Sequence, residues 1–333
     1  MRMILIFFFF FLICLLPYCN GQKPFGTEHL KLEKEILMPN VKGRIDHIAV
    51  NPKEQILYVA ALGNNSIEVI DLRAGKVIKS IKGLDEPQGV TYIPETNELV
   101  VANGGNGDCI FYNATTFDKV TSIHLSNDAD NIRYNGLTGK IYIGYGDGGI
   151  VEVDSKSHKV LKDARLNAHP ESFQIDQKND RIFVNLPDAN SIAVLKLSDL
   201  KLVDTWKIKN ERANFPMTLD TANNLVIVGY RRPASLVCYD AKSGKELSRA
   251  ELVGDVDDVF YYQGAKEILA SGGAGYINIF KAENSTNLRQ IANIPTRDGA
   301  RTGLIVPSLE IFSLAERANG GKEAAVAVYK IVK

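Results

Sequence analysis

Short apolar segments recur along the chain at a nearly constant spacing. An apolar run precedes each main one, as in DHIAV at 46–50, another follows it, as in SIEVID at 66–71, and a more polar run such as KVIKSI at 76–81 often comes next. Short runs of β-branched and aromatic residues bounded by Gly, Pro, Asn and Asp are typical of β-strands. The seven main runs begin 41 to 43 residues apart: ILYVA at 56–60, LVVAN at 99–103, IYIGY at 141–145, IFVNL at 182–186, LVIVG at 225–229, ILASG at 268–272 and IFSLA at 311–315.

This repeat predicts a β-propeller. Four short strands in each repeat of about 40–45 residues describe one propeller blade. A single blade cannot cover both of its faces, whereas seven blades stacked in a ring cover the faces of every sheet. We therefore predict an all-β, seven-bladed β-propeller over residues 22–333, with blades at about 44–84, 85–127, 128–168, 169–212, 213–254, 255–297 and 298–333.

The two ends of the repeat predict how the ring closes. The last repeat supplies three strands before the chain ends, and residues 29–38 (HLKLEKEILM) resemble the polar fourth run of the other repeats. We expect this N-terminal segment to pair as the outermost strand of the seventh blade. The ring is then closed by strand pairing.

Several of these runs resemble a known repeat family. LYVA (57–60), LVVAN (99–103), IFVN (182–185) and the turns from Asp71 to Lys76 and from Asp240 to Lys245 are similar to YVTN-type β-propeller repeats, over about residues 30–333. The resemblance implies the propeller fold. It also implies an exported bacterial-type protein, because that family includes surface-layer, cell-envelope and periplasmic proteins.

The first residues indicate export. Arg2 precedes an unbroken apolar run from Met3 to Leu16, which is shorter than the roughly 20 residues that span a bilayer. A basic start, a short apolar core and small residues at a cleavage point are typical of a secretory signal. We predict a signal peptide over residues 1–21 and a periplasmic or extracellular mature chain without a transmembrane helix. Lipoprotein processing at Cys19 is the alternative, although Tyr18 is bulky for such a site.

The balance of charged residues narrows the class of binding partner. The 333 residues carry 39 Lys+Arg and 39 Asp+Glu, for a formal net charge of +0. A nucleic-acid-binding protein would carry a basic excess, so no nucleic-acid partner is expected. We expect a monomer that binds a small molecule or a protein.

Cysteine use and glycine-rich turns exclude some chemistry. Cys109 and Cys238 of the mature chain lie in apolar strand contexts in different blades and are expected to be unpaired. Without a CxxC or a Cys/His cluster, a zinc site is not expected. GDGG (146–149) is interpreted as a hairpin turn, because no full GxxxxGK[ST] motif is present.

The residues before each innermost strand differ from blade to blade. In a propeller these positions surround one mouth of the axial channel, which makes them candidates for ligand binding. The predicted site comprises Asp46, His47, Gln88, Asp130, Asn131, Glu171, Asp257, Asp258 and Arg301, with Arg44, Asp128, His169, Phe215, Asp255, Arg297, Asp298 and Thr302 as neighbours.

This set predicts a mostly acidic funnel with arginines near blades seven and one. Converging carboxylates repel one another unless they are protonated, paired with Arg44 or Arg301, or neutralised by a cation. Exchange of Asp130 and Asp257 for Asn is therefore expected to abolish binding without lowering the melting temperature. No cofactor is predicted, although hard oxygen ligands suit a divalent cation such as Ca²⁺ or Mg²⁺.

Three interpretations of the mouth remain open. The polar residues could cap turns and solvate the channel. They could bind a ligand in a non-enzymatic module. They could also support a hydrolase or lyase with metal- or histidine-assisted chemistry, in which His47 and His169 would act as acid/base groups.

Overall fold

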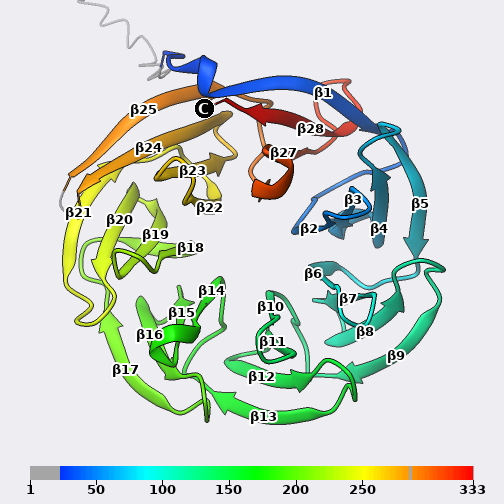
Figure 1. Ribbon diagram of the computed structural model, residues 1–333, viewed down its shortest axis with the longest axis horizontal. Coiled ribbons are helices and arrows are strands. Elements are labelled where there is room, and N and C mark those ends of the chain that lie inside the picture. Colours follow the sequence, from blue (N-terminus) through cyan, green and yellow to red (C-terminus); the bar gives the residue numbers. More distant parts are fainter. Residues whose placement is uncertain (1–22, 285–286, 333) are drawn as a thin grey trace, which may run out of the picture.

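Seven four-stranded antiparallel sheets form a closed ring in the computed structural model, which describes residues 23–284 and 287–332 (Figure 1). The prediction of an all-β, seven-bladed propeller is confirmed. In each sheet the strands lie in chain order from the channel outward, apart from the seventh. Blades one to three contain β2 (Ile48–Asn51), β3 (Ile56–Ala61), β4 (Ser66–Asp71), β5 (Lys76–Lys82), β6 (Pro87–Ile93), β7 (Glu98–Asn103), β8 (Asp108–Asn113), β9 (Lys119–His124), β10 (Ile132–Asn135), β11 (Lys140–Tyr145), β12 (Gly149–Asp154) and β13 (Val160–Arg165).

The remaining blades follow the same plan. Blades four to six contain β14 (Phe173–Asp176), β15 (Arg181–Leu186), β16 (Ser191–Lys196), β17 (Leu202–Lys207), β18 (Arg212–Asp220), β19 (Leu225–Arg232), β20 (Ala234–Asp240), β21 (Glu246–Glu251), β22 (Val256–Tyr262), β23 (Glu267–Gly272), β24 (Tyr276–Asn284) and β25 (Asn287–Pro295). Blade seven contains β26 (Gly303–Val306), β27 (Ile311–Glu316), β28 (Ala324–Ile331) and β1 (Leu30–Met38). Short 3-10 turns lie at Thr27–His29, Leu62–Asn64, Gln177–Asn179 and Pro307–Leu309.

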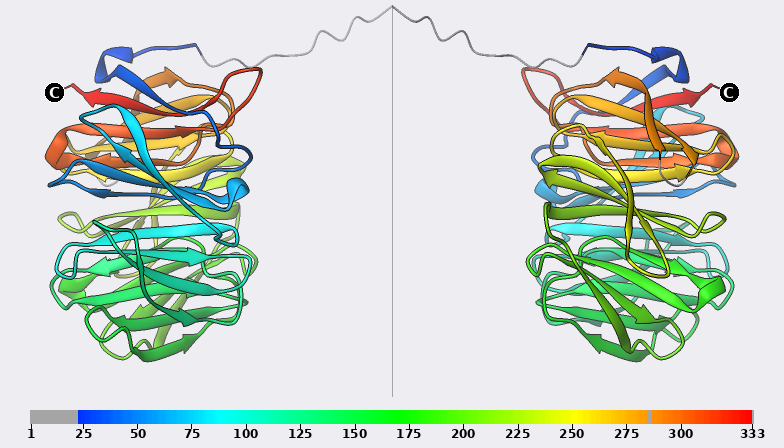
Figure 2. Two further views of the ribbon diagram at one scale, coloured as in Figure 1. Left: turned by 90° about the vertical axis from the view of Figure 1, so that its right-hand side faces the viewer. Right: turned by 90° about the vertical axis from the view of Figure 1, so that its left-hand side faces the viewer.

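The N-terminal strand closes the ring, as predicted. β1 pairs antiparallel with β28 from Leu30 opposite Ile331 to Met38 opposite Ala324. Figure 2 shows the blue N-terminal strand lying beside the red C-terminal strands. Alternation along β1 buries Ile36 and Met38 against blades seven and one and leaves Leu37 exposed. The closing strand therefore contributes to the core as well as to the hydrogen-bonded ladder.

Burial follows the radial position of each strand. The second and third strands are covered on both faces by neighbouring blades, so all six residues of β7 are buried. The outer strands face solvent on one side, as the alternation in β9 shows. Cys109 and Cys238 are buried and unpaired in the third strands of blades two and five, in agreement with the sequence prediction.

A bulge recurs where the outermost strand of each blade pairs with the third. In blade one the register shifts between Val69 and Ile70, and in blade seven it shifts between Leu32 and Lys34 of β1. Corresponding shifts occur in the other five blades. A β-bulge bends a strand and increases its twist. The outer strands can thereby follow the curved wall of the ring.

Candidate functional site

A polar cavity of about 640 Å³ lies at one mouth of the axial channel. It is formed by the segments that lead into the innermost strands and by turns between second and third strands. We call it the mouth cavity. All nine residues predicted as a ligand site line it: Asp46, His47, Gln88, Asp130, Asn131, Glu171, Asp257, Asp258 and Arg301.

Close backbone packing brings blades two and three together beside this cavity. A Cβ atom on Gly89 would lie 1.8 Å from the carbonyl oxygen of Asp130, so a larger residue would collide with the backbone. Gln88, directly before this glycine, donates a hydrogen bond from Nε2 to Oδ1 of Asp128 at 2.9 Å. The glycine therefore allows the side chains of two blades to meet at the mouth.

Asp130 lies between two histidines of different blades. Nε2 of His47 lies 3.5 Å from Oδ1 of Asp130, and Nε2 of His169 lies 4.0 Å from Oδ2. His169 is oriented by a 2.7 Å contact between its Nδ1 and the carbonyl oxygen of Gly146. Nearby, Nη2 of Arg44 lies 2.6 Å from Oδ2 of Asp46. Blades one, three and four thus share one network of charges.

Burial and these contacts together shift the pKa values of the histidines and acids at the mouth. Burial opposes the charged form of both imidazoles, yet contacts with Asp130 and the charges of nearby carboxylates raise the pKa of His47 to about 10 and that of His169 to about 9. Burial also opposes the Asp130 anion, but the two histidines lower its pKa overall. Burial raises the pKa of Glu171 to about 8, assisted by the Asp130 charge. At neutral pH the histidines are therefore cationic and Glu171 is largely protonated.

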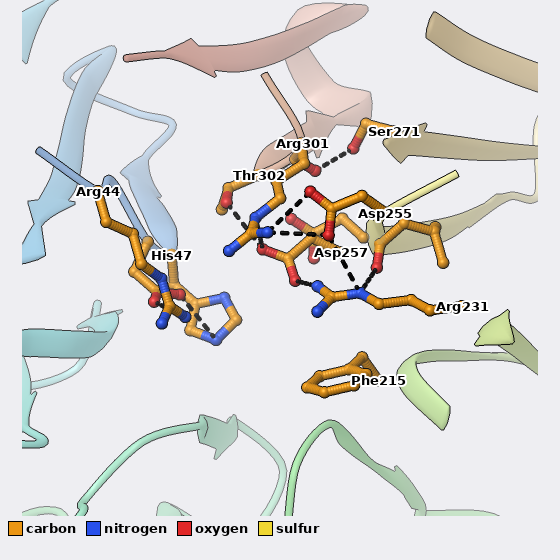
Figure 3. Close-up of polar contacts among 12 residues, drawn as sticks. Arg44, His47, Phe215, Arg231, Asp255, Asp257, Ser271, Arg301 and Thr302 are labelled. Atoms are coloured by element: carbon orange, nitrogen blue, oxygen red, sulfur yellow. Dashed lines mark hydrogen bonds and ion pairs between the residues drawn. The ribbon is translucent and has the colours of Figure 1, made fainter. Parts of the chain in front are cut away.

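A square of alternating charges occupies the opposite side of the mouth. It consists of Arg231, Asp257, Arg301 and Asp255 (Figure 3). Nη1 of Arg301 lies 2.9 Å from both oxygens of Asp255, and its Nε lies 3.1 Å from Oδ2 of Asp257. The guanidinium of Arg231 pairs with Asp257 and lies 3.9 Å from the centre of the Phe215 ring.

The square shows how repulsion at Asp257 is relieved. From the sequence, converging carboxylates are expected to repel one another unless they are protonated, paired with Arg44 or Arg301, or neutralised by a cation. Asp257 pairs with Arg301, and Arg231, which the sequence analysis does not single out, is its second partner. Asp257 also accepts a hydrogen bond from Oγ1 of Thr302 at 3.2 Å. Two opposite charges neutralise each aspartate, so this side of the mouth needs no ligand to be stable.

Other carboxylates at the mouth have no arginine partner among the residues that the structure describes. Asp147 and Asp188 lie on exposed hairpin turns of blades three and four, and Glu86 lies on the exposed segment that leads into blade two. We call these three residues and Asp128, whose Oδ2 lies 3.4 Å from Nδ1 of His169, the acidic wall of the cavity. Nine acidic residues line the cavity in all, against three arginines and two histidines.

One buried amide within the cavity lacks a hydrogen-bond partner. Asn131 is 2% exposed, and its Nδ2 donates to Oδ2 of Asp130 at 3.4 Å. Its Oδ1 has no partner among the described residues. A buried acceptor without a partner is costly, and a ligand donor would satisfy it.

Sequence reasoning missed part of the site. Arg231 lies outside the predicted site because it ends a second strand, β19, whereas the predicted site comprises positions before the innermost strands. The available signal is the Arg231–Arg232–Pro233 run, which follows the apolar run LVIVG (225–229) after a single residue, Tyr230. Asp147 belongs to the predicted GDGG turn (146–149), and Asp188 lies outside the predicted site. Conversely, Arg297 and Asp298 do not line the cavity, and Arg297 pairs with Glu316 at 2.8 Å instead.

Two further features were sought among the described residues, a group of metal-ligating side chains and a membrane-spanning helix. No group of three or more His, Cys, Asp or Glu side chains in residues 23–284 and 287–332 is arranged to hold a metal ion. The described part of the chain also contains no helix that is long and apolar enough to cross a membrane.

Comparisons with known proteins support the fold. No family model matches the sequence, and no curated protein matches it significantly. A chain in the crystal structure of the Mitotic Checkpoint Complex is similar, with a TM-score of 0.77 and 15% sequence identity over 100% of this chain and 99% of that chain. In all, 1809 chains of solved structures match. Propellers commonly serve as interaction modules, and so low an identity identifies the architecture alone.

Proposed function

We propose that this protein is a binding module whose mouth cavity takes a polar ligand with a cationic group. The observation that carries the proposal is the acidic wall, whose carboxylates lack arginine partners while those of the facing square are neutralised. A ligand ammonium or guanidinium would supply the missing positive charge, and a donor beside it would satisfy Oδ1 of Asn131. Such a cation could belong to a free small molecule or to a Lys or Arg side chain of a protein partner.

Calorimetric titration with a simple polycation tests the proposal. We expect spermidine to bind the purified protein. The triple variant Glu86→Gln/Asp147→Asn/Asp188→Asn should weaken this binding at least tenfold. The matched control Glu28→Gln/Glu54→Gln/Asp118→Asn removes three exposed acidic residues away from the mouth and should bind spermidine like the natural sequence.

Parallel titrations distinguish the sources of the cation. Tighter binding of an arginine-rich peptide than of spermidine would indicate a protein partner. Tighter binding of Ca²⁺ or Mg²⁺ than of spermidine would indicate that the ligand of the acidic wall is a metal ion and not an organic cation. Equal affinity of both triple variants for every probe would contradict the acidic wall as a binding surface.

One observation favours an enzymatic alternative. Glu171 is largely protonated at neutral pH and lines the cavity beside the imidazolium of His169. A protonated carboxyl group in this position can donate a proton to a leaving group, as a hydrolase or lyase requires. Turnover of a lactone or ester panel that is lost in Glu171→Gln would support this alternative, and the absence of turnover would leave the binding module.

We further propose that the protein is exported and belongs among YVTN-type propellers. The apolar run from Met3 to Leu16 and the repeat motifs support this assignment. The signal peptide over residues 1–21 and the alternative lipidation site at Cys19 lie outside the described residues. N-terminal sequencing of the secreted form should begin at Gln22. A chain that begins at Met1, or one lipidated at Cys19, would contradict cleavage after residue 21.

A further inference from the structure

A second cavity of about 510 Å³ lies deeper in the channel. All seven innermost strands contribute to its lining, and His47 and Asp258 line both this cavity and the mouth cavity. We call it the axial chamber. The acidic wall plays no part in it, so its chemistry is independent of the function proposed above.

The repeat places one equivalent side chain from every blade on the wall of this chamber. The last residue of each innermost strand to pair with the second strand lies opposite the first residue of that strand, as Asn51 lies opposite Ile56 in blade one. The equivalent side chain belongs to the residue two positions earlier in the innermost strand. These seven positions are Ala49, Thr91, Arg133, Gln174, Thr218, Phe260 and Leu304. All seven line the chamber, which is expected because alternate residues of a strand share one face.

This ring of side chains is divided by polarity. Consecutive innermost strands are neighbours, and β26 closes on β2. Arg133 is therefore flanked by Thr91 and Gln174. In a seven-membered ring the blades across from blade three are six and seven, whose residues are Phe260 and Leu304. Figure 1 shows β10 of blade three across the ring from β27 of blade seven. A cation on one side of the chamber thus faces an apolar surface on the other.

Arg133 has no ion-pair partner among the described residues. Its Nη1 donates to the carbonyl oxygen of Ile132 at 2.9 Å, and its Nη2 lies 3.4 Å from Oγ of Ser172. The ring of Phe173 lies 5.5 Å from the guanidinium carbon. Burial lowers the pKa of Arg133, although the charges of Asp258 and Asp130 oppose the shift. The guanidinium is poorly solvated and has unused capacity for a bidentate anion.

Asp258 does not serve as an ion-pair partner for Arg133. Among the described residues that line the chamber it is the one carboxylic acid, and its Oδ2 accepts a hydrogen bond from the backbone nitrogen of Gly303 at 2.8 Å. Burial raises the pKa of Asp258 to about 7, so part of its population is neutral at neutral pH. The positive charge of Arg133 is therefore incompletely balanced.

We propose that the axial chamber binds a small carboxylate with an apolar body, such as an aryl carboxylate, through a bidentate contact with Arg133. The carboxylate would lie between Thr91 and Gln174, and the apolar body would pack against Phe260 and Leu304. The chamber has a cationic group on one side and an apolar surface on the other. Acetate and inorganic phosphate lack an apolar body that could contact this surface, so they should bind much more weakly than an aryl carboxylate.

Benzoate titration of the purified protein tests this site. We expect Arg133→Gln to weaken benzoate binding at least tenfold, and Phe260→Ala to weaken it while leaving acetate binding unchanged. The control Arg73→Gln removes an exposed arginine from an outer hairpin of blade one and should bind benzoate normally. Unchanged benzoate affinity in Arg133→Gln would overturn the proposal, because the mouth arginines would then be the binding groups.

Two further measurements cover other outcomes. If Arg133→Gln does not fold, Arg133→Lys keeps the charge without the planar fork and should still weaken benzoate binding. Crystals soaked in 4-bromobenzoate should show anomalous bromine signal beside Phe260 and Leu304. Signal elsewhere, or none, would overturn the proposal. The acidic-wall triple variant should retain benzoate binding, so failure of one proposal is distinguishable from failure of the other.

Discussion

At the scale of single residues, folding raises the pKa values of two histidines at the mouth of the channel. His47 and His169 have pKa values of about 10 and 9, compared with 6.5 for the free side chain. Between pH 6.5 and 9 the folded protein therefore binds protons that the unfolded chain has released. Under these conditions the free energy of unfolding falls as the pH rises. Asp130 has the opposite sign, because its lowered pKa stabilises the fold above the usual pKa of an aspartate.

We expect urea denaturation to show lower stability at pH 8 than at pH 6. One proton bound in the folded state and released on unfolding corresponds to a slope of about 1.4 kcal/mol per pH unit. His47→Gln removes one such proton and should flatten the slope. A slope that is the same in His47→Gln and the natural sequence would show that His47 is uncharged in the folded protein.

The charge square makes a different prediction from the one that the sequence favoured. Asp257→Asn leaves Arg231 and Arg301 with Asp255 as their remaining partner in the square. We therefore expect Asp257→Asn to lower the free energy of unfolding by about 1.5–3 kcal/mol, as measured by urea denaturation. The exposed rim residue Asp188 offers a control, because Asp188→Asn should change stability by less than about 0.5 kcal/mol. Equal stability of both variants would mean that like-charge repulsion had offset the lost ion pairs.

At the scale of single strands, β1 provides a test of ring closure. Ile36 is 1% exposed and packs in the core between blades seven and one, whereas the adjacent Leu37 is 51% exposed. Ile36→Ala should lower the free energy of unfolding by about 2–4 kcal/mol, because it leaves a cavity. Leu37→Ala should change it by less than about 0.5 kcal/mol. If Ile36→Ala melts like the natural sequence, β1 is not needed to hold the ring closed.

The third strands of blades two and five bury two thiols. Burial raises the pKa of Cys238 to about 12 and also raises that of Cys109. Iodoacetamide should therefore leave both residues unmodified in the folded protein and alkylate both after denaturation without reductant. Mass spectrometry of the two peptides gives the result. A thiol that resists alkylation after denaturation would be in a disulfide, in conflict with the ring.

At the scale of the whole molecule, the ring was predictable because the apolar runs recur every 41 to 43 residues along the sequence. The seven apolar runs and residues 29–38 fix the number of blades and the closing strand, since burial on both faces demands apolar second and third strands. The nine mouth residues were found for the same reason, because closure brings equivalent positions together. Their partners were not predictable. Arg231 reaches Asp257 from an extension of β19, and the two-histidine contact of Asp130 depends on distances across blades.

At this scale we expect the protein to be a monomer. Neighbouring blades cover the inner strands, and outer strands such as β5 carry several lysines, which discourage pairing with another chain. Sedimentation equilibrium of the mature protein, which is proposed to begin at Gln22, should give the mass of one chain. Twice that mass at micromolar concentration would show that an exposed outer strand forms an interface.

Closure through β1 and β28 also constrains the order of events while the chain is synthesised. β1 emerges from the ribosome before any blade, yet its partner β28 is the last strand to be made. Blades one to six can form in turn, but β1 must wait unpaired until β28 has been made. While β1 is unpaired, it can pair with the exposed edge of another sheet, which would misfold the chain. Binding of β1 by a chaperone during this time would prevent such mispairing. Closure of the ring is therefore the last step in its assembly.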